Sequence, residues 1–140
     1  MKYIIFILCS IAYCSLTAKE AEAAEPIFRC QTENNKSIEV YKDKERVTYL
    51  FGRDGYPPEI KLTKSIYEAE ISMENISGNG LSNSIKFSNG EYTYRVITEI
   101  DRTATVQVPK HGVLVKRNAS YLTYISCLSD TVQGSLLDLQ

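Results

Sequence analysis

Polar and apolar residues alternate over most of this 140-residue chain, in short runs that are separated by turn-forming residues. Successive side chains of a β-strand point to opposite faces, so this alternation is typical of strands with one buried face. Helical spacing is hard to find, and we therefore expect an all-β chain. The predicted strands are Ile27–Gln31, Ser37–Lys42, Arg46–Phe51, Glu59–Thr63, Ala69–Asn75, Ser84–Ser88, Glu91–Thr98, Thr103–Val108, Gly112–Arg117 and Ser120–Leu128.

This succession of short strands favours an antiparallel meander, in which strands that follow each other in the sequence pair side by side. A small barrel and a two-sheet sandwich both hide the edges of such a sheet. We prefer the barrel and keep the sandwich as the alternative. The tail from Ser129 to Gln140 has weak apolar spacing, which fits either a short helix or a loose segment.

Two turn signals predict hairpins within the meander. Asn89-Gly90 is a dipeptide that favours a tight primed turn, and a second hairpin is expected to turn at Arg117-Asn118-Ala119. The first turn sets the register of the strands on either side of it. The side chains expected to face the core are Phe87, Tyr92, Tyr94 and Val96, and those expected to face water are Lys86, Glu91, Thr93 and Arg95.

The first residues have the three parts of a secretory leader. Lys2 provides a positive start, an apolar stretch extends to about Ala12, and Ala21-Glu22-Ala23 is a small-residue cleavage site. We predict a signal peptide over residues 1–23 and one domain over residues 24–140. Because the apolar stretch is shorter than the roughly 20 residues that span a bilayer, we expect no stable membrane anchor. The expected localisation is the periplasm.

The cysteines divide between the leader and the body. Cys9 and Cys14 would leave with the leader, and the bulky Tyr13 disfavours the alternative in which Cys14 is lipidated. Cys30 and Cys127 remain, one near each end of the body, and an export compartment would oxidise them. We therefore expect one disulfide that joins the first strand to the last.

The inventory of reactive side chains is poor. The single histidine, His111, is expected in a β-turn, so no metal and no cofactor is implied. The carboxylate pairs Glu99 with Asp101 and Glu68 with Glu70 are expected to face solvent, and no Gly-x-Ser-x-Gly motif is present. We expect that the protein is not an enzyme. Its formal net charge of -1, with basic and acidic residues interspersed, also predicts no nucleic-acid partner.

Two loops are candidates for contact with a partner. Asn75–Asn83 offers amide and hydroxyl side chains, two glycines and a leucine, Leu81, that we expect to be exposed. A plain flexible turn is the alternative interpretation of this segment. Gly52–Pro58 is a second loop, and its Tyr56 and its charged side chains are expected to be displayed to solvent.

At the first of these loops the chain resembles a known family. Ile76-Ser77-Gly78-Asn79-Gly80, followed by the segment Phe87–Tyr94 and a last strand that ends in a cysteine, is similar to the second half of the small periplasmic C-type lysozyme inhibitors. That family consists of exported β-barrel proteins. The size, the leader and the all-β body also resemble periplasmic immunity proteins of the pesticin type, which protect a bacteriocin producer from its own muramidase.

The resemblance implies a function that needs no chemistry of its own. In the inhibitor family a Ser-Gly loop and a later Lys-Gly element enter the lysozyme cleft and bond its catalytic carboxylates. Ser77 and Gly78 match the first element, whereas the second has no match and would be replaced by Lys86 or Arg95.

We therefore expect an exported protein that binds and inhibits a peptidoglycan-cleaving muramidase, for lysozyme inhibition or bacteriocin immunity, by inserting a loop into the active-site cleft. The alternative is a periplasmic or surface binding module for glycan, lipid or an envelope protein. The expected contact residues are Ser77, Gly78, Asn79, Ser82 and Lys86, flanked by Arg53, Tyr56 and Arg95.

Overall fold

A computed structural model describes residues 25–76 and 80–139 of the protein. Those two ranges contain strands and short 3₁₀ segments but no α-helix, which confirms the all-β prediction. No helix within them is long and apolar enough to cross a membrane. The elements are β1 (Phe28–Gln31), β2 (Lys36–Asp43), β3 (Arg46–Arg53), β4 (Ile60–Ser65), β5 (Glu70–Ile76), β6 (Gly80–Asn89), β7 (Tyr92–Asp101), β8 (Lys110–Arg117), β9 (Ser120–Ser126), η1 (Ser129–Thr131), β10 (Gln133–Gly134) and η2 (Leu136–Leu139).

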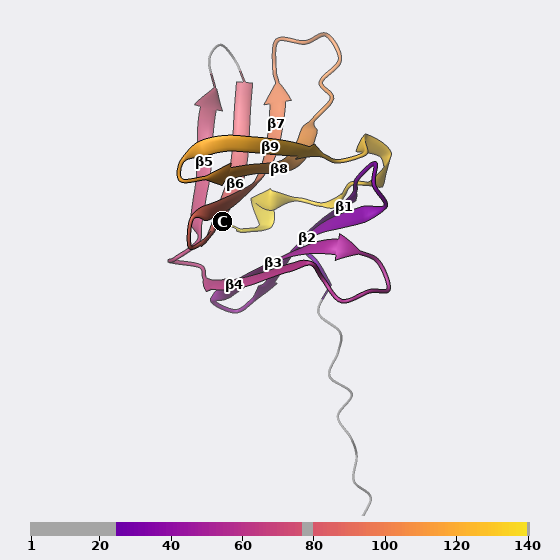
Figure 1. Cartoon of the computed structure of the whole chain (residues 1–140). Helices are drawn as coiled ribbons and strands as arrows, with labels where there is room; N and C mark the ends of the chain where they lie inside the picture. Colours follow the sequence, from indigo (N-terminus) through magenta and orange to yellow (C-terminus); the bar gives the residue numbers. More distant parts are fainter. Residues whose placement is uncertain (1–24, 77–79, 140) are drawn as a thin grey trace, which may run out of the picture.

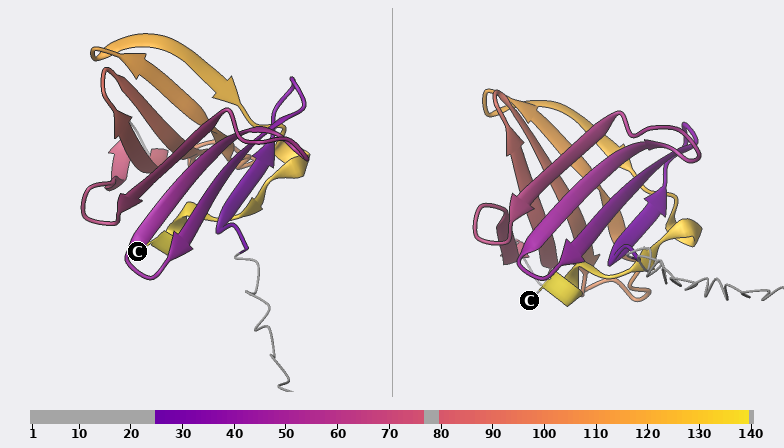
Figure 2. Two further views of the ribbon diagram at one scale, coloured as in Figure 1. Left: turned by 60° about the horizontal axis from the view of Figure 1, so that its bottom comes forward. Right: turned by 90° about the horizontal axis from the view of Figure 1, so that it is seen from below.

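The strands form two antiparallel five-stranded sheets that face each other across one core (Figures 1 and 2). The N-sheet has the order β10-β1-β2-β3-β4, and the C-sheet has the order β5-β6-β7-β8-β9. From β1 to β4 and again from β5 to β9, strands that follow each other in the sequence pair side by side, so the predicted meander is confirmed within each sheet. The closed barrel that we preferred is wrong, and the two-sheet alternative is correct.

The barrel does not close because the ladder of hydrogen bonds is interrupted at both corners. Between β4 and β5 the chain turns over residues 66–69, and the amides of Ile66 and Ala69 donate to the carbonyls of Glu45 and Ser65. At the other corner, β1 already has β2 and β10 as its two neighbours. It therefore has no free edge for β9, and an isolated bridge between Thr32 and Cys127, the residue after β9, connects the two sheets at this corner.

Inward-facing side chains from both sheets make up the core. Tyr49 of the N-sheet stacks against Phe87 and Tyr94 of the C-sheet, with ring centroids 5.6 Å apart in each pair. Phe87 and Val96 are fully buried and Tyr94 packs against the core, as the alternation predicted. The other fully buried side chains are Phe28, Cys30, Ile38, Val40, Val47, Ile85 and Val113.

The β6–β7 hairpin turns one residue later than predicted. Asn89 pairs with Tyr92, so Gly90 and Glu91 are the turn residues, and Gly90 has a φ of +59°. Glycine at the first central position is typical of a type II′ turn. Because a shift of the turn by one residue moves the register by two, every side chain keeps its face. The second hairpin is as predicted, with Asn118 and Ala119 both at positive φ.

The predicted strand Thr103–Val108 is wrong. Residues 102–109 form a loop between β7 and β8, and β7 pairs directly with β8, which leaves this segment no edge to join. Asp101 organises the start of the loop by accepting hydrogen bonds from the amide and the hydroxyl of Thr103. Since β8 begins at Lys110, His111 lies in a strand and not in the predicted turn.

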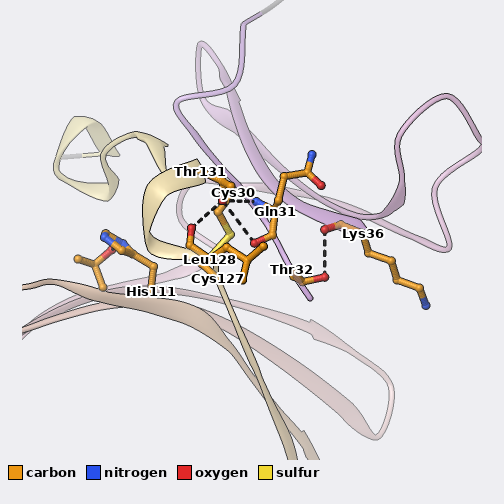
Figure 3. The surroundings of a disulfide bond; sticks show 9 residues. Cys30, Gln31, Thr32, Lys36, His111, Cys127, Leu128 and Thr131 are labelled. Atoms are coloured by element: carbon orange, nitrogen blue, oxygen red, sulfur yellow. Dashed lines mark hydrogen bonds between the residues drawn. A yellow bond between two sulfur atoms is a disulfide. The ribbon is translucent and has the colours of Figure 1, made fainter. Parts of the chain in front are cut away.

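The disulfide between Cys30 and Cys127 is confirmed, and it joins β1 to the end of β9 (Figure 3). The hydrogen bonds around it hold the chain end against β1: the Leu128 amide donates to the Gln31 carbonyl, and the Gln31 amide donates to the Thr131 hydroxyl. Beyond this point β10 pairs with β1, and the η2 leucines Leu136 and Leu139 are buried in the core. Of the two expectations for the tail, the short packed helix is therefore confirmed for Leu136–Leu139, and the loose segment is wrong.

Candidate functional site

The structure separates the predicted contact residues into two groups on different sheets. Ser82 and Lys86 lie on β6 and Arg95 lies on β7 of the C-sheet. Arg53 ends β3 of the N-sheet, and Tyr56 follows it in the loop before β4. Ser77, Gly78 and Asn79 fall outside the described residues. The predicted residues that can be placed therefore do not form one continuous site.

The first group belongs to a cavity on the outer face of the C-sheet. Lys86 and Arg95 lie directly opposite each other on β6 and β7, and Thr93 on β7 lies opposite Lys116 on β8. Because these side chains alternate with the buried ones on their strands, they point away from the core. They surround a cavity of about 220 Å³, which we call the basic cavity; its lining residues are Lys86, Thr93, Arg95, Leu114, Lys116 and Ala119.

Cations outnumber anions at the basic cavity. Lys86 forms an ion pair with Glu70 on β5, whereas Arg95 and Lys116 have no ion-pair partner among the described residues. Like charges directly opposite each other destabilise a sheet, so the pairing of Lys86 with Arg95 is unfavourable for the isolated protein. An anionic group from outside would offset this repulsion, because both cations could donate charge-assisted hydrogen bonds to it.

The opposite end of the same face is acidic. Ser82 lies between Glu74 on β5 and Glu99 on β7, and Gly80 lies opposite Asp101. At about 3.3 Å per residue, Ser82 is ~13 Å from Lys86 along β6. The expectation that Ser82 and Lys86 belong to one inserted loop is therefore wrong.

The predicted loop Asn75–Asn83 is also shorter than expected. Residues 70–76 belong to β5 and residues 80–83 belong to β6. Asn83 is buried and Leu81 is half-buried, although we expected Leu81 to be exposed. The sequence suggested a loop because its Gly, Ser and Asn residues are frequent in turns, but here the pairing of β6 with β5 and β7 overrides that local preference.

The second group, Arg53 and Tyr56, lines a cavity next to a hydrogen-bonded cluster on the outer face of the N-sheet. The Ser37 hydroxyl lies 3.0 Å from a carboxylate oxygen of Glu39 and 2.9 Å from one of Asp54. The Arg29 guanidinium donates to Asp54 at 2.6 Å and lies 3.6 Å from Glu39. Because the Ser37 hydroxyl has only one hydrogen, it can donate to only one of the two carboxylates at a time. The Arg29 guanidinium lies near both carboxylates, and its positive charge offsets the repulsion between them.

Burial and hydrogen bonding alter the acidity of two groups in this cluster. Burial, together with the hydrogen bond that the Tyr41 hydroxyl donates to Glu39, raises the pKa of Tyr41 to about 12. Burial by itself would raise the pKa of Asp54. The hydrogen bonds from Gln31 and Ser37 and the charge of Arg29 outweigh it and lower the Asp54 pKa below its ordinary value.

A groove runs from this cluster along the outer face of the N-sheet. A cavity of about 340 Å³ lies between the cluster and the Arg53–Tyr56 loop, and a second cavity of about 410 Å³ shares Tyr41 and Leu50 with it. Tyr56 lies at one end of the groove, where it is 68% exposed and the Arg53 guanidinium is 5.9 Å from its ring centroid. Arg46 and Lys61 lie at the other end. We call the two cavities together the N-sheet groove.

His111 is part of the core side of the C-sheet. Its Nδ1 is 2.8 Å from the Thr98 hydroxyl, and its ring centroid is 5.7 Å from that of Phe28. Burial lowers the pKa of His111, so the imidazole is largely neutral at pH 7. Within residues 25–76 and 80–139, no three side chains of His, Cys, Asp or Glu converge as ligands for a metal ion.

Sequence reasoning missed several residues of both sites. Lys116 and Leu114 of the basic cavity come from β8, and their proximity to Arg95 depends on the β7–β8 register. Arg29 and Asp54 are far apart in the sequence and meet only because β1, β2 and β3 are neighbours. The alternation indicated that these side chains face outward, but no sequence signal brought them together. Comparison of the chain with protein-family models, with curated proteins and with solved structures finds no match.

Proposed function

We propose that the protein is an exported periplasmic inhibitor of a peptidoglycan-cleaving muramidase, acting as a lysozyme inhibitor or as the immunity protein of a bacteriocin producer. The observation that carries the proposal is the basic cavity, where Arg95 and Lys116 are cations without an ion-pair partner in the described part of the chain. Glycosidases of this kind act through paired carboxylates in an open cleft. A cationic surface fits such a cleft by charge.

The distribution of charge favours a different contact from the inserted loop that the sequence suggested. The end of the C-sheet near the β5–β6 turn carries Glu74, Glu99 and Asp101, which would repel catalytic carboxylates. The basic cavity at the other end would attract them. We therefore propose that the outer face of the C-sheet covers the cleft, with Arg95 at its centre.

Inhibition of this kind benefits from a rigid surface. Lys86 and Arg95 lie on β6 and β7, two inner strands that are each paired on both sides. Their backbones are therefore ordered before binding, so less conformational entropy is lost when the complex forms. Strand pairing thus fixes the backbone positions of both cationic residues before a partner binds.

The proposal is tested by titration. The protein with its disulfide formed is added to muramidases of several structural types, and lysis of purified peptidoglycan is followed at one fixed enzyme concentration. We expect loss of activity at a one-to-one ratio with one type, and weaker inhibition as ionic strength rises because the contact is electrostatic. Full activity of every muramidase at excess protein would reject the proposal.

The N-sheet groove favours a second candidate function, a binding module for glycan chains. An exposed tyrosine, Tyr56, lies beside the clustered side chains of Arg29, Glu39 and Asp54, and the groove continues past Tyr41. Sugar rings stack on aromatic faces, and carboxylates and guanidinium groups bond sugar hydroxyls. Direct binding of soluble peptidoglycan fragments that is lost in Tyr56→Ala and retained in Arg95→Glu would favour this function over inhibition.

A further inference from the structure

The polar side chains of the basic cavity come from three neighbouring strands of the C-sheet. Arg95 on β7 lies directly opposite Lys86 on β6. Arg95 is also a diagonal neighbour of Lys116 on β8, since Lys116 lies opposite Thr93 on the same face. Diagonal neighbours in a sheet are within reach of each other's long side chains. Arg95 therefore has a cation on either side and a hydroxyl beside it, and all four side chains line one cavity.

The cavity has an excess of positive charge and of hydrogen-bond donors. Lys86 is paired with Glu70 on β5, but an ammonium group has three donors, so this pairing leaves others for a ligand. Arg95 and Lys116 have no ion-pair partner among the described residues. Of the described residues that line the cavity, none is acidic. Three cations and the Glu70 carboxylate therefore leave two positive charges without a counter-charge.

Partial burial strengthens the effect of these charges. The Lys86 side chain is 23% exposed, and Arg95 and Lys116 are also half-buried. Leu114, which lies opposite Arg95 on β8, adds an apolar part to the cavity wall. Water and salt screen such charges less than they screen charges on fully exposed side chains. An anion in the basic cavity would therefore be held more strongly than an anion beside exposed lysines.

We propose that the basic cavity is a binding site for one phosphate group, either inorganic phosphate or a terminal phosphomonoester. Such a group has a charge of about -1.5 to -2 near neutral pH and three acceptor oxygens, which match the charge and the donors of the cavity. A carboxylate has a single charge and two oxygens in one plane. Donors from three strands suit a tetrahedral group, and the Arg95 guanidinium can bond two of its oxygens at once.

The rest of the outer face restricts the ligand to an isolated phosphate. Glu74, Glu99 and Asp101 lie toward the other end of β5 and β7. A nucleic-acid strand that continued along the sheet would bring its next phosphates against these carboxylates, and the repulsion would oppose binding. A free phosphate, or one terminal phosphate on a small molecule or a lipid headgroup, avoids this repulsion. The ligand class is therefore a single phosphate and not a polyanion.

This inference shares the basic cavity with the proposed inhibition, but it does not require a muramidase. Phosphate binding is measured on the isolated protein, and inhibition is measured with the enzyme present. Phosphate binding without inhibition would reject only the proposed function. Inhibition without phosphate binding would overturn only the present inference. The two proposals can therefore fail separately.

The first test is calorimetric titration of the protein, with its Cys30–Cys127 disulfide formed, with inorganic phosphate at about pH 7.5, where phosphate is mostly dianionic. The ionic strength is held at about 0.1 M, so that charges more than about 10 Å apart are largely screened. We expect one phosphate per protein and binding of acetate that is at least about tenfold weaker. Arg95→Gln should weaken phosphate binding about tenfold, because it removes charge-assisted hydrogen bonds. Arg102→Gln makes the same change in the exposed loop after β7 and should bind phosphate like the wild type.

A second pair of variants tests the charge of the cavity in the opposite direction. Glu70→Gln frees Lys86 from its ion pair and should tighten phosphate binding about threefold. Glu74→Gln makes the same change on the same strand, four residues or ~13 Å farther along, and should have a much smaller effect. The thermal midpoint of each variant checks that it is folded. Equal effects of the two substitutions would overturn the assignment of the site to this cavity.

Vesicles distinguish the two sources of the phosphate. Phosphatidylcholine vesicles with a minor fraction of phosphatidic acid present a terminal phosphomonoester, and pure phosphatidylcholine vesicles are the control. Sedimentation of the protein with the first kind alone would assign the site to a lipid headgroup, whereas binding of inorganic phosphate without vesicle binding would assign it to a soluble phosphate. Binding of neither, acetate binding as tight as phosphate binding, or equal weakening by Arg95→Gln and Arg102→Gln would overturn the inference.

Discussion

Cys30 and Cys127 are 97 residues apart in the sequence, yet their Cα atoms are 5.7 Å apart. The disulfide between them lies next to the bridge between Thr32 and Cys127, where the two sheets are in backbone contact. β9 has no other strand of the N-sheet as a neighbour. The covalent bond therefore closes the corner that strand pairing leaves open.

We predict that Cys30→Ala with Cys127→Ala lowers the free energy of unfolding by about 4 kcal/mol, since the bond closes a long loop in the unfolded chain. Urea denaturation of the oxidised wild type and of the double variant measures the difference. The wild type treated with a reductant should match the variant. A loss of less than about 1 kcal/mol would contradict the assignment of this stability to the closed loop.

Reversal of one charge should separate binding from stability. Arg95→Glu is expected to weaken muramidase inhibition about tenfold or more, because it places a carboxylate against the carboxylates of the cleft. The thermal midpoint should not fall, since Arg95 has no ion-pair partner in the described ranges and a glutamate at this position would remove the repulsion from Lys86 opposite it. The inhibition constant and the melting curve are the two measurements.

Lys61→Glu is the matched control for Arg95→Glu. It makes the same change of charge on β4 of the N-sheet, which the proposed contact does not include. Inhibition by this variant should stay within about twofold of the wild type, because a distant exposed charge acts only through screened electrostatics. Equal weakening by both substitutions would point to net charge as the cause and not to the basic cavity.

The N-sheet cluster predicts a dependence of stability on pH. The Asp54 pKa is below its ordinary value in the folded protein, so at acidic pH the unfolded chain binds more protons than the folded one. The contribution of Asp54 is therefore present at pH values above the unfolded pKa and is lost as the pH falls through the folded pKa. Asp54→Asn should lower stability at pH 7 and flatten the fall of the unfolding free energy below about pH 4.

Asp43→Asn is the comparison for this pH experiment. Asp43 is an exposed aspartate at the end of β2, and its side chain has no hydrogen bond or ion pair in the part of the chain that the structure covers. Its pH profile should parallel that of the wild type. Parallel profiles for Asp54→Asn and the wild type would show instead that the cluster does not stabilise the charged form of Asp54.

Gly112 on β8 should not tolerate a side chain. A Cβ at this position would lie 2.5 Å from the Ile125 carbonyl oxygen and 2.5 Å from the Tyr124 ring. Because the carbonyl belongs to the paired backbone of β9, we expect Gly112→Ala to destabilise the fold by about 1 to 3 kcal/mol. Ser126→Ala, at the exposed position opposite Gly112, should change stability by less than about 0.5 kcal/mol in the same urea titration. Equal effects of the two substitutions would contradict the close packing.

The alternation of the sequence determined which face of its sheet a side chain occupies. Phe87, Tyr94 and Val96 face the core, and Lys86 and Arg95 face outward, although the turn between their strands is one residue from its predicted place. The prediction survives this error because face depends only on a period of two. The two body cysteines likewise sufficed to predict their pairing, since no other partner remained for either.

The tertiary structure alone decided which strands are edges and which outward-facing residues are neighbours. Whether the sheet closes depends on β10, which occupies the free edge of β1. Because β10 has only two residues, it is too short to show an alternating pattern in the sequence. The strand that we predicted at residues 103–108 is wrong because β7 pairs directly with β8. An alternating pattern forms a strand only where the edge of another strand is free to pair with it. The basic cavity and the N-sheet groove both result from long-range pairing, and a sequence specifies such pairing only through the whole fold.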